Sequence, residues 1–375
     1  MRTAVISDLH LGAGSDGDLL RRASFRERLL AGLGEVDRVV LLGDVVELRD
    51  RPIADAFALA EPFFRELAEA RPDAEIVVVP GNHDHHLLEA WLERRRLEGA
   101  APLRLEQEID PGETAFAGLA RVLGEHRVRI AYPGMWLRPD TYATHGHYLD
   151  RHLTIPTLER LGVAAVERLL GFEPPGPDPL EPPAGRQSVD PDEYERAQAP
   201  VYALLFALAQ GSARERGPGA GPSMRIWRAV EGGEGGRGSR VRGWILGTVV
   251  VPGAVGIANR LGLGPVSADL SAGAITRAGL AAIADVAERL DIGAEHLIFG
   301  HTHRRGPLSG EEGWTAGDTT LWNTGSWVHA PTLLGPTAAT SPYWPGTVAV
   351  VDDEGSPELR HLLDDLERPD LEQRE

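Results

Sequence analysis

The 375-residue sequence contains no cysteine, which excludes disulfide bonds and metal sites built on thiolates. It also contains no lysine, so all 38 basic residues are arginine. This absence indicates compositional bias and carries no functional information. No apolar stretch is continuous enough for a membrane-spanning helix, which needs about 20 apolar residues. Met1 leads within a few residues into a predicted strand, with no cleavable signal segment, so we expect a cytoplasmic protein.

Basic charge is scarce relative to acidic charge, since 56 acidic residues give a formal net charge of -18. Proteins that bind nucleic acid usually carry a basic surface, so this balance argues against such a partner. The hydrophobic share of 42% is typical of a soluble globular protein. The length allows one large core or two ordinary ones.

Five short apolar segments are each followed by residues that can bind a metal ion. Ligands of open α/β sheets collect just beyond the carboxyl ends of the strands, so these residues are candidates for one site. The candidates are Asp8 and His10 after 3–7, Asp44 after 39–42, Asn82, His83 and Asp84 after 76–79, His145 and His147 after 142–144, and His301 and His303 after 296–299.

Aspartate and histidine without cysteine suit hard to borderline divalent ions such as manganese, iron or zinc. The candidate ligands are too many for one ion, so we expect two. Asp44, with two carboxylate oxygens, is the natural bridge between them. In Asp8-Leu9-His10 the first and third residues of an extended segment point to the same side and can reach one ion. The same holds for His301 and His303.

The remaining polar candidates could act around the ions. His83 directly follows Asn82, so its imidazole could stand over the reaction centre as an acid. Asp84 could hold and polarise that imidazole. We expect His145 to be a metal ligand, and His147 to support a ligand or contact the substrate.

The segments between the candidate ligands predict the organisation of the chain. Helical spacing over 19–33 and 54–70 gives a β-α-β-α-β order, which predicts neighbouring parallel strands. We expect a catalytic core at 1–150 and 290–360, a mainly helical inserted cap at 151–289 and a disordered acidic tail at 361–375.

The stretch 243–259 carries no charge but contains glycine and proline, which argues against a membrane-spanning helix. Two interpretations remain open. It is a buried helical hairpin of the inserted cap, or a lid that contacts a membrane surface or holds a lipid chain. The second would place the protein at the inner face of the membrane.

The complete set of blocks resembles the calcineurin-like metallophosphoesterase superfamily, in that family's order. The blocks are Asp8-x-His10, Gly43-Asp44, Gly81-Asn82-His83-Asp84, His145 and Gly300-His301-x-His303. The resemblance implies an α/β (α+β) fold, a four-layer αββα sandwich of two mixed β-sheets flanked by helices. It also implies a metal-dependent hydrolase that cleaves a phosphoester or pyrophosphate bond in a phosphodiester, a nucleotide or a lipid-linked substrate.

The resemblance further implies a role for each residue. One metal ion would be held by Asp8, His10 and His303. The other would be held by Asn82, His145 and His301, with Asp44 as the bridge. His83 and Asp84 match the family's catalytic pair. We expect Mn²⁺, with Fe, Zn, Ni and Mg as alternatives.

The sequence agrees only in part with individual branches of the family. Val45-Val46-Glu47-Leu48 follows Asp44, in place of the Asp-Arg-Gly continuation of protein Ser/Thr phosphatases. Asp8-Leu9-His10-Leu11 and the insertion resemble the branch that cleaves the pyrophosphate of UDP-2,3-diacylglucosamine, although that branch has an aspartate in place of His147. The alternatives are a nuclease of the same fold, and a non-catalytic, metal-stabilised binding protein docked on a membrane through 243–259.

Overall fold

The computed structural model describes residues 1–124, 127–171, 188–216, 264, 266–267, 269, 271–331 and 333–373. The uncharged stretch 243–259 lies outside these residues, so neither interpretation of it is tested. Within the described ranges, no helix combines the length and hydropathy that crossing a bilayer requires.

The first sheet contains the strands that carry most of the candidate ligands. β1, β2 and β3 are parallel neighbours, as the β-α-β-α-β order predicts, and β5 continues the sheet beyond β3. On the other side, β11 pairs antiparallel with β1, and β12 with β11. The bounds are β1 Thr3–Ile6, β2 Arg38–Leu42, β3 Glu75–Val79, β11 Thr347–Val351 and β12 Glu358–His361.

The second sheet begins on the same long strand, β5, whose second half pairs with β6. β7 lies parallel between β6 and β10, and the short strands β8 and β9 pair with β10. β4 pairs with β5 on the side of the first sheet. The bounds are β4 Glu106–Ile109, β5 Val128–Arg138, β6 Thr141–Thr144, β7 His296–Phe299, β8 Arg305–Gly306, β9 Thr315–Ala316 and β10 Thr319–Thr324.

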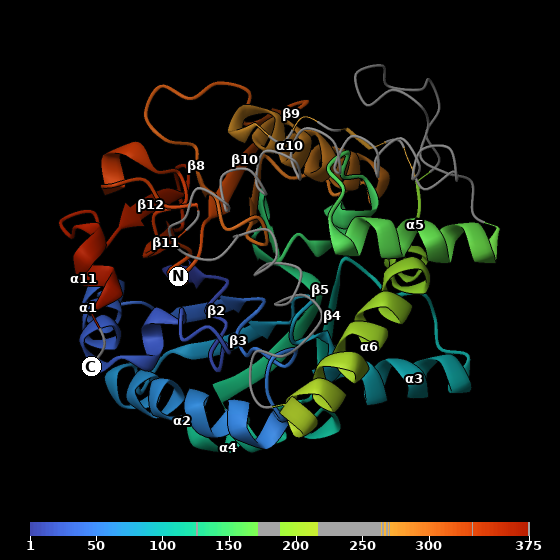
Figure 1. Ribbon diagram of the computed structural model, residues 1–375, viewed down its shortest axis with the longest axis horizontal. Coiled ribbons are helices and arrows are strands. Elements are labelled where there is room, and N and C mark those ends of the chain that lie inside the picture. Colours follow the sequence, from blue (N-terminus) through green and yellow to red (C-terminus); the bar gives the residue numbers. More distant parts are fainter. Residues whose placement is uncertain are drawn as a thin grey trace, which may run out of the picture.

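The two sheets pack face to face and are covered by helices on both outer faces. Val40 and Val77 of the first sheet share a core with Met135 and Ile298 of the second. Figure 1 shows α2 and α4 on one side of the sheets and α10 on the other. These layers confirm the predicted four-layer sandwich. The helices are α1 Ala23–Leu33, α2 Ile53–Ala70, α4 Ala117–Leu123 and α10 Ala272–Arg289.

Alternation along the strands explains how one sheet serves two cores. In β2, Val40 faces the second sheet, whereas Leu41 packs with Phe64 of α2 and with the other helices of the outer layer. Both faces of the strand are therefore buried, which accounts for its continuous apolar sequence.

The predicted helix at 19–33 is divided in two, because Arg22 adopts an extended backbone between a short 3₁₀ helix, η1 (Leu19–Arg21), and α1.

The described part of the predicted insertion 151–289 is helical. α5 (Leu158–Leu170) and α6 (Pro191–Arg216) pack together through Val163 and Val201. α10 differs from the predicted boundary, because Ile283 packs against Leu297 of the second sheet and so belongs to the outer layer of the core. α6 also runs beside η2 (His85–Leu88) and α3 (Glu89–Glu98), near the candidate site.

The prediction of a disordered tail is wrong for the described residues up to Gln373. Leu363 and Leu371 are buried in the core of the first sheet, and Trp344 Nε1 donates a hydrogen bond to the carbonyl of Leu363. A short helix, α11 (Arg368–Glu372), follows. The prediction followed the acidic composition of this segment. The burial of its two leucines nevertheless holds the segment on the core. Other 3₁₀ helices among the described residues are η3 Pro111–Glu113, η5 His147–Arg151 and η7 Ala338–Thr340.

Candidate metal centre

The candidate ligands gather where β1, β2, β3, β6 and β7 end, and five of them have a left-handed backbone. Their φ angles are 53° at Asp8, 45° at His10, 50° at Asp44, 65° at His301 and 57° at His303. Such a backbone costs a non-glycine residue about 1–3 kcal/mol and persists only where the surroundings impose it. The concentration of this strain marks a functional site.

Glycines allow the ligand loops to approach one another. A Cβ on Gly43 would collide with the imidazole of His145, and one on Gly81 would collide with the carboxylate of Asp44. At Gly300 it would meet the carboxylate of Asp8. The glycines that precede Asp44, Asn82 and His301 are therefore required by packing within the site.

The first group of candidate ligands consists of Asp8, His10 and His303. His10 Nε2 lies 3.1 Å from His303 Nε2, which in turn lies 3.3 Å from Asp8 Oδ1. Asp8 Oδ1 is buried and accepts no hydrogen bond. Two imidazole nitrogens that face each other beside an unsatisfied carboxylate oxygen suit a divalent cation.

The second group consists of Asn82, His145 and His301. Asn82 Oδ1 lies 3.2 Å from His145 Nε2 and 3.1 Å from His301 Nδ1. His145 Nδ1 donates to the carbonyl of Leu42 at 3.0 Å, which directs Nε2 into the site. This group also offers nitrogen and oxygen donors converging on one point.

Asp44 joins the two groups. Its Oδ2 lies 3.6 Å from His10 Nε2 and 3.4 Å from His145 Nε2. The potential ligand atoms of Asp8, His10 and His303 all lie within 4.8 Å of one another, and so do those of Asp44, His145 and His301. The structure therefore brings together every residue that the sequence suggested as a ligand.

The electrostatics of the site favour a cation. Burial disfavours a charged His10, but the hydrogen bond to Glu47 and the charge of Asp44 outweigh it and raise the pKa to about 9. Burial likewise opposes charge on His145, yet Asp44 raises its pKa to about 10. The neighbouring carboxylates thus favour positive charge, a proton or a metal ion, at His10 and His145.

The carboxylate partner of His83 is Glu47, so the pairing predicted with Asp84 is wrong. Glu47 Oε2 lies 2.7 Å from His83 Nδ1 and 2.9 Å from His10 Nδ1. Asp84 instead accepts hydrogen bonds from the backbone N–H groups of Gly81 at 2.6 Å and Val45 at 2.7 Å. Asp84 therefore ties together two ligand-bearing loops.

The sequence contained a signal for Glu47, because this carboxylate comes three residues after Asp44, on the loop that leaves the same strand. Burial opposes its charge, but the charge of His83 and the hydrogen bonds from His10 and His83 lower its pKa far below the ordinary value. Glu47 is thus a carboxylate at neutral pH and can orient the imidazole of His83.

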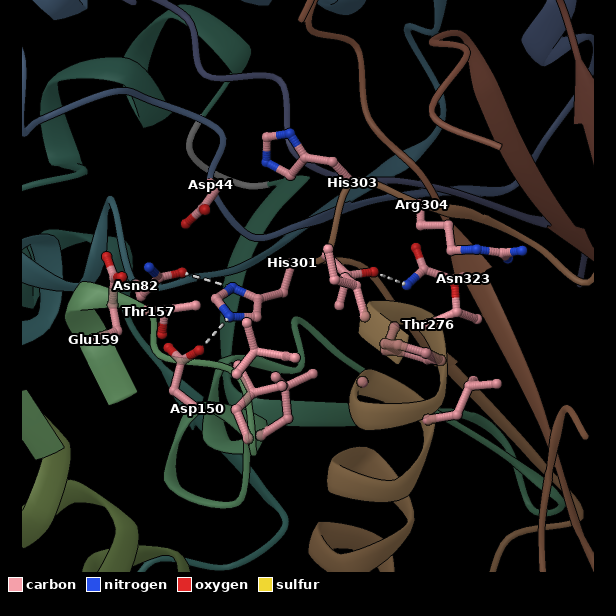
Figure 2. A pocket seen from close by; sticks show the side chains of 18 of the residues that line it. Asp44, Asn82, Asp150, Thr157, Glu159, Thr276, His301, His303, Arg304 and Asn323 are labelled. Atoms are coloured by element: carbon pink, nitrogen blue, oxygen red, sulfur yellow. Dashed lines mark hydrogen bonds and ion pairs between the residues drawn. The ribbon is translucent and has the colours of Figure 1, made fainter. Parts of the chain in front are cut away.

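Asp150 is a second residue that the sequence reading missed. Its Oδ1 lies 2.9 Å from His301 Nε2, on the opposite side of the ring from Asn82, as Figure 2 shows. Carboxylates that hold a ligating histidine in this way fix its tautomer and orientation. Asp150 lies in η5, where no strand pattern indicated a site.

His147 lies behind the ligands. Its Nε2 is 3.2 Å from the hydroxyl of Tyr132, and its ring centroid is 5.6 Å from that of His145. Burial and the nearby charge of His145 lower its pKa well below the usual value. Of the two predicted roles, this position favours support of His145 over contact with a substrate.

Two cavities open from the site. One, of about 300 Å³, extends from Asp44 and His301 towards α10. The other, of about 330 Å³, lies between η2 and α6 and includes Arg49. Asn82 and His83 line both cavities, so the candidate centre is accessible from two sides.

The model of the calcineurin-like phosphoesterase family matches residues 1–182, which include every candidate ligand up to His145. This part of the chain is similar to the calcineurin-like phosphoesterase family, and the α/β sandwich is consistent with that family's fold. The family implies metal-dependent hydrolysis of phosphoesters, and the His and Asp groups described above could bind metal ions. No curated protein matches the sequence.

Proposed function

We propose that the protein hydrolyses a phosphodiester or pyrophosphate bond with the help of two divalent metal ions. The observation that carries this proposal is the position of Asp44 between two groups of ligands, beside His83. The first ion would be held by Asp8, His10 and His303, the second by Asn82, His145 and His301, and both by Asp44.

Mn²⁺ is the preferred ion, because imidazole, carboxylate and amide donors without thiolate suit it, with Fe, Zn, Ni and Mg as alternatives. When bound, such ions supply Lewis acidity that activates water and offsets the negative charge of phosphoryl oxygens.

His83 supplies the proton that the leaving group needs. Its Nδ1 faces Glu47, which leaves Nε2 for a substrate, and the side chain is partly exposed to both cavities. Its backbone N–H donates to Asp44 Oδ1 at 2.8 Å, which fixes the loop relative to the ligands. An imidazole held in this way can protonate the departing oxygen.

The two cavities favour a substrate with two substituents on phosphorus. A phosphoryl group beside Asn82 and His83 has room for one substituent on each side, whereas a monoester needs only one cavity. A pyrophosphate remains within this class, consistent with the Asp8-Leu9-His10-Leu11 block. The UDP-2,3-diacylglucosamine branch has an aspartate where this chain has His147, so we do not assign that branch's substrate to this protein. The net charge of -18 argues against a nuclease.

The direct test compares Asp44→Asn with Asp291→Asn. Both residues have a left-handed backbone, but Asp291 is exposed and outside the site. With Mn²⁺ and bis(p-nitrophenyl) phosphate, Asp44→Asn should fall to the background rate while Asp291→Asn keeps the wild-type rate. Wild-type turnover in Asp44→Asn would contradict the dinuclear assignment. A fully metal-loaded but inactive wild type would favour a non-catalytic binding protein.

Substrate preference provides a second test. The wild type should have a higher kcat/KM for bis(p-nitrophenyl) phosphate than for p-nitrophenyl phosphate, because only the diester uses both cavities. A preference for the monoester would contradict the two-sided site. Single-stranded DNA with Mn²⁺ should remain intact, and its rapid digestion would favour the nuclease alternative.

A further inference from the structure

We propose that the cavity between the metal centre and α10 binds a compact apolar group on the phosphoester substrate and so selects the substrate class. This inference rests on the proposed function. It adds that one substituent on phosphorus is an aryl group or a short alkyl group, and that it lies against α10.

The cavity combines candidate ligands with a largely apolar lining. Its volume of about 300 Å³ is at the small end of the range for ligand pockets, which suits a ring or a few methylene groups. Figure 2 shows Asn82 and Asp150 beside His301. Thr276 lies on α10, on the other side of the cavity. The apolar lining includes Leu149, Leu153, Ile155, Ile275, Leu280 and Trp314.

Several of these side chains are only partly buried by the protein itself. Ile155, Ile275 and Leu280 are intermediate in exposure, so they present apolar surface to the cavity. A ligand group that covered this surface would gain affinity of about threefold to fourfold for each buried methylene group. The lining therefore favours the binding of an apolar substituent.

The charges around the cavity disfavour an anionic substituent. Arg304, the arginine among the described lining residues, forms an ion pair with Glu311, and its guanidinium lies 5.1 Å from the ring centroid of Trp314. Asp150, which pairs with His301, and Glu159, which pairs with Arg49, line the same cavity. The cavity beside η2 differs, since it is lined by arginines (Arg49, Arg96 and Arg196).

Gly279 keeps the wall of the cavity open. A glycine inside a helix costs about 1 kcal/mol relative to alanine. Among the residues that the structure describes, a Cβ at this position would have only Thr302 Cγ2 within 4 Å, at an ordinary 3.6 Å, so their packing does not require glycine here, in contrast to Gly43. A larger side chain at 279 would extend into the space that we assign to the substrate.

The experiment uses Mn²⁺-loaded full-length protein and three p-nitrophenyl phosphodiesters whose second substituent is methyl, butyl or benzyl. Wild-type kcat/KM should rise at least about tenfold from the methyl to the butyl ester, given the gain per methylene group. In Gly279→Phe the ratio of butyl to methyl should fall to near one. Gly273→Phe, an exposed position on the same helix, should retain the wild-type ratio.

A second variant tests the inference independently, in case Gly279→Phe does not fold. Ile275→Gln keeps the length of a partly exposed side chain but makes it polar, so the butyl-to-methyl ratio should also fall. Equal kcat/KM for the three esters in the wild type, or an unchanged ratio in both variants, would overturn the inference while leaving the proposed hydrolysis intact. Failure to hydrolyse any ester would instead contradict the proposed function.

Discussion

Two carboxylates near His83, those of Asp84 and Glu47, have different roles because they have different hydrogen-bond partners. Asp84 is adjacent in sequence, but its oxygens are occupied by the backbone N–H groups of Gly81 and Val45. Glu47 comes from another loop, yet its Oε2 contacts His83 and His10. Proximity along the chain therefore misidentifies the carboxylate that orients the imidazole.

These contacts predict that two conservative substitutions affect different properties, one the activity and the other the stability. Glu47→Gln should lower kcat by up to about 100-fold, because His83 loses the charge that orients it as an acid. Asp84→Asn should lower the free energy of unfolding by about 1–3 kcal/mol, since an amide NH₂ would face a buried backbone N–H. Steady-state kinetics and urea unfolding measure the two effects. A normal kcat in Glu47→Gln would contradict its assignment.

At the scale of elements, the strand ends were predictable and the loops were not. The segments before Asp8, Asp44 and Asn82 are apolar and end in glycine or a polar residue, which is a local pattern. Glu47 and Asp150 lie on a loop and a 3₁₀ helix, where no periodicity indicates which way a side chain points. Their roles depend on loops that meet only in the folded chain.

β5 shows a second limit of local patterns. Residues 128–132 form a strand candidate in the sequence, and the next two residues, Pro133 and Gly134, are of types that weaken strands. The strand instead continues to Arg138 and connects the two sheets, with Pro133 opposite Glu106 of the edge strand β4. The connection between the sheets therefore required the tertiary structure.

α6 is attached to the core through a buried glutamate. Glu195 accepts hydrogen bonds from Tyr132 at 2.5 Å and Tyr148 at 2.7 Å, and its other oxygen lies 2.9 Å from His85 Nε2. Burial opposes its charge, but the charge of His85 and these hydrogen bonds lower its pKa below the ordinary 4.5. The ionised form is thus the one that stabilises the fold.

Glu195→Gln should therefore destabilise the protein in a pH-dependent way. A lowered pKa in the folded state gives stability that is complete above the ordinary pKa and is lost as the pH falls through the folded value. Urea unfolding at pH 7 should show a loss of about 1–3 kcal/mol, which shrinks below pH 4.5. The exposed control Glu98→Gln should show no such loss. A difference that grows on acidification would contradict the assignment.

At the scale of the whole molecule, the candidate centre depends on the complete sandwich. Asp8 and His303 are far apart in the sequence but only 3.3 Å apart in the structure, and β5 connects the first sheet to the second, which contains β7. The family match covers residues 1–182, whereas His301 and His303 follow much later. The site is therefore a property of the folded chain rather than of the matched segment alone.

The most direct test is anomalous diffraction from a crystal of the Mn²⁺-loaded protein. We expect two manganese peaks, both in contact with Asp44, one beside Asp8 and His10 and the other beside Asn82 and His145. A single peak, or peaks away from Asp44, would contradict the account.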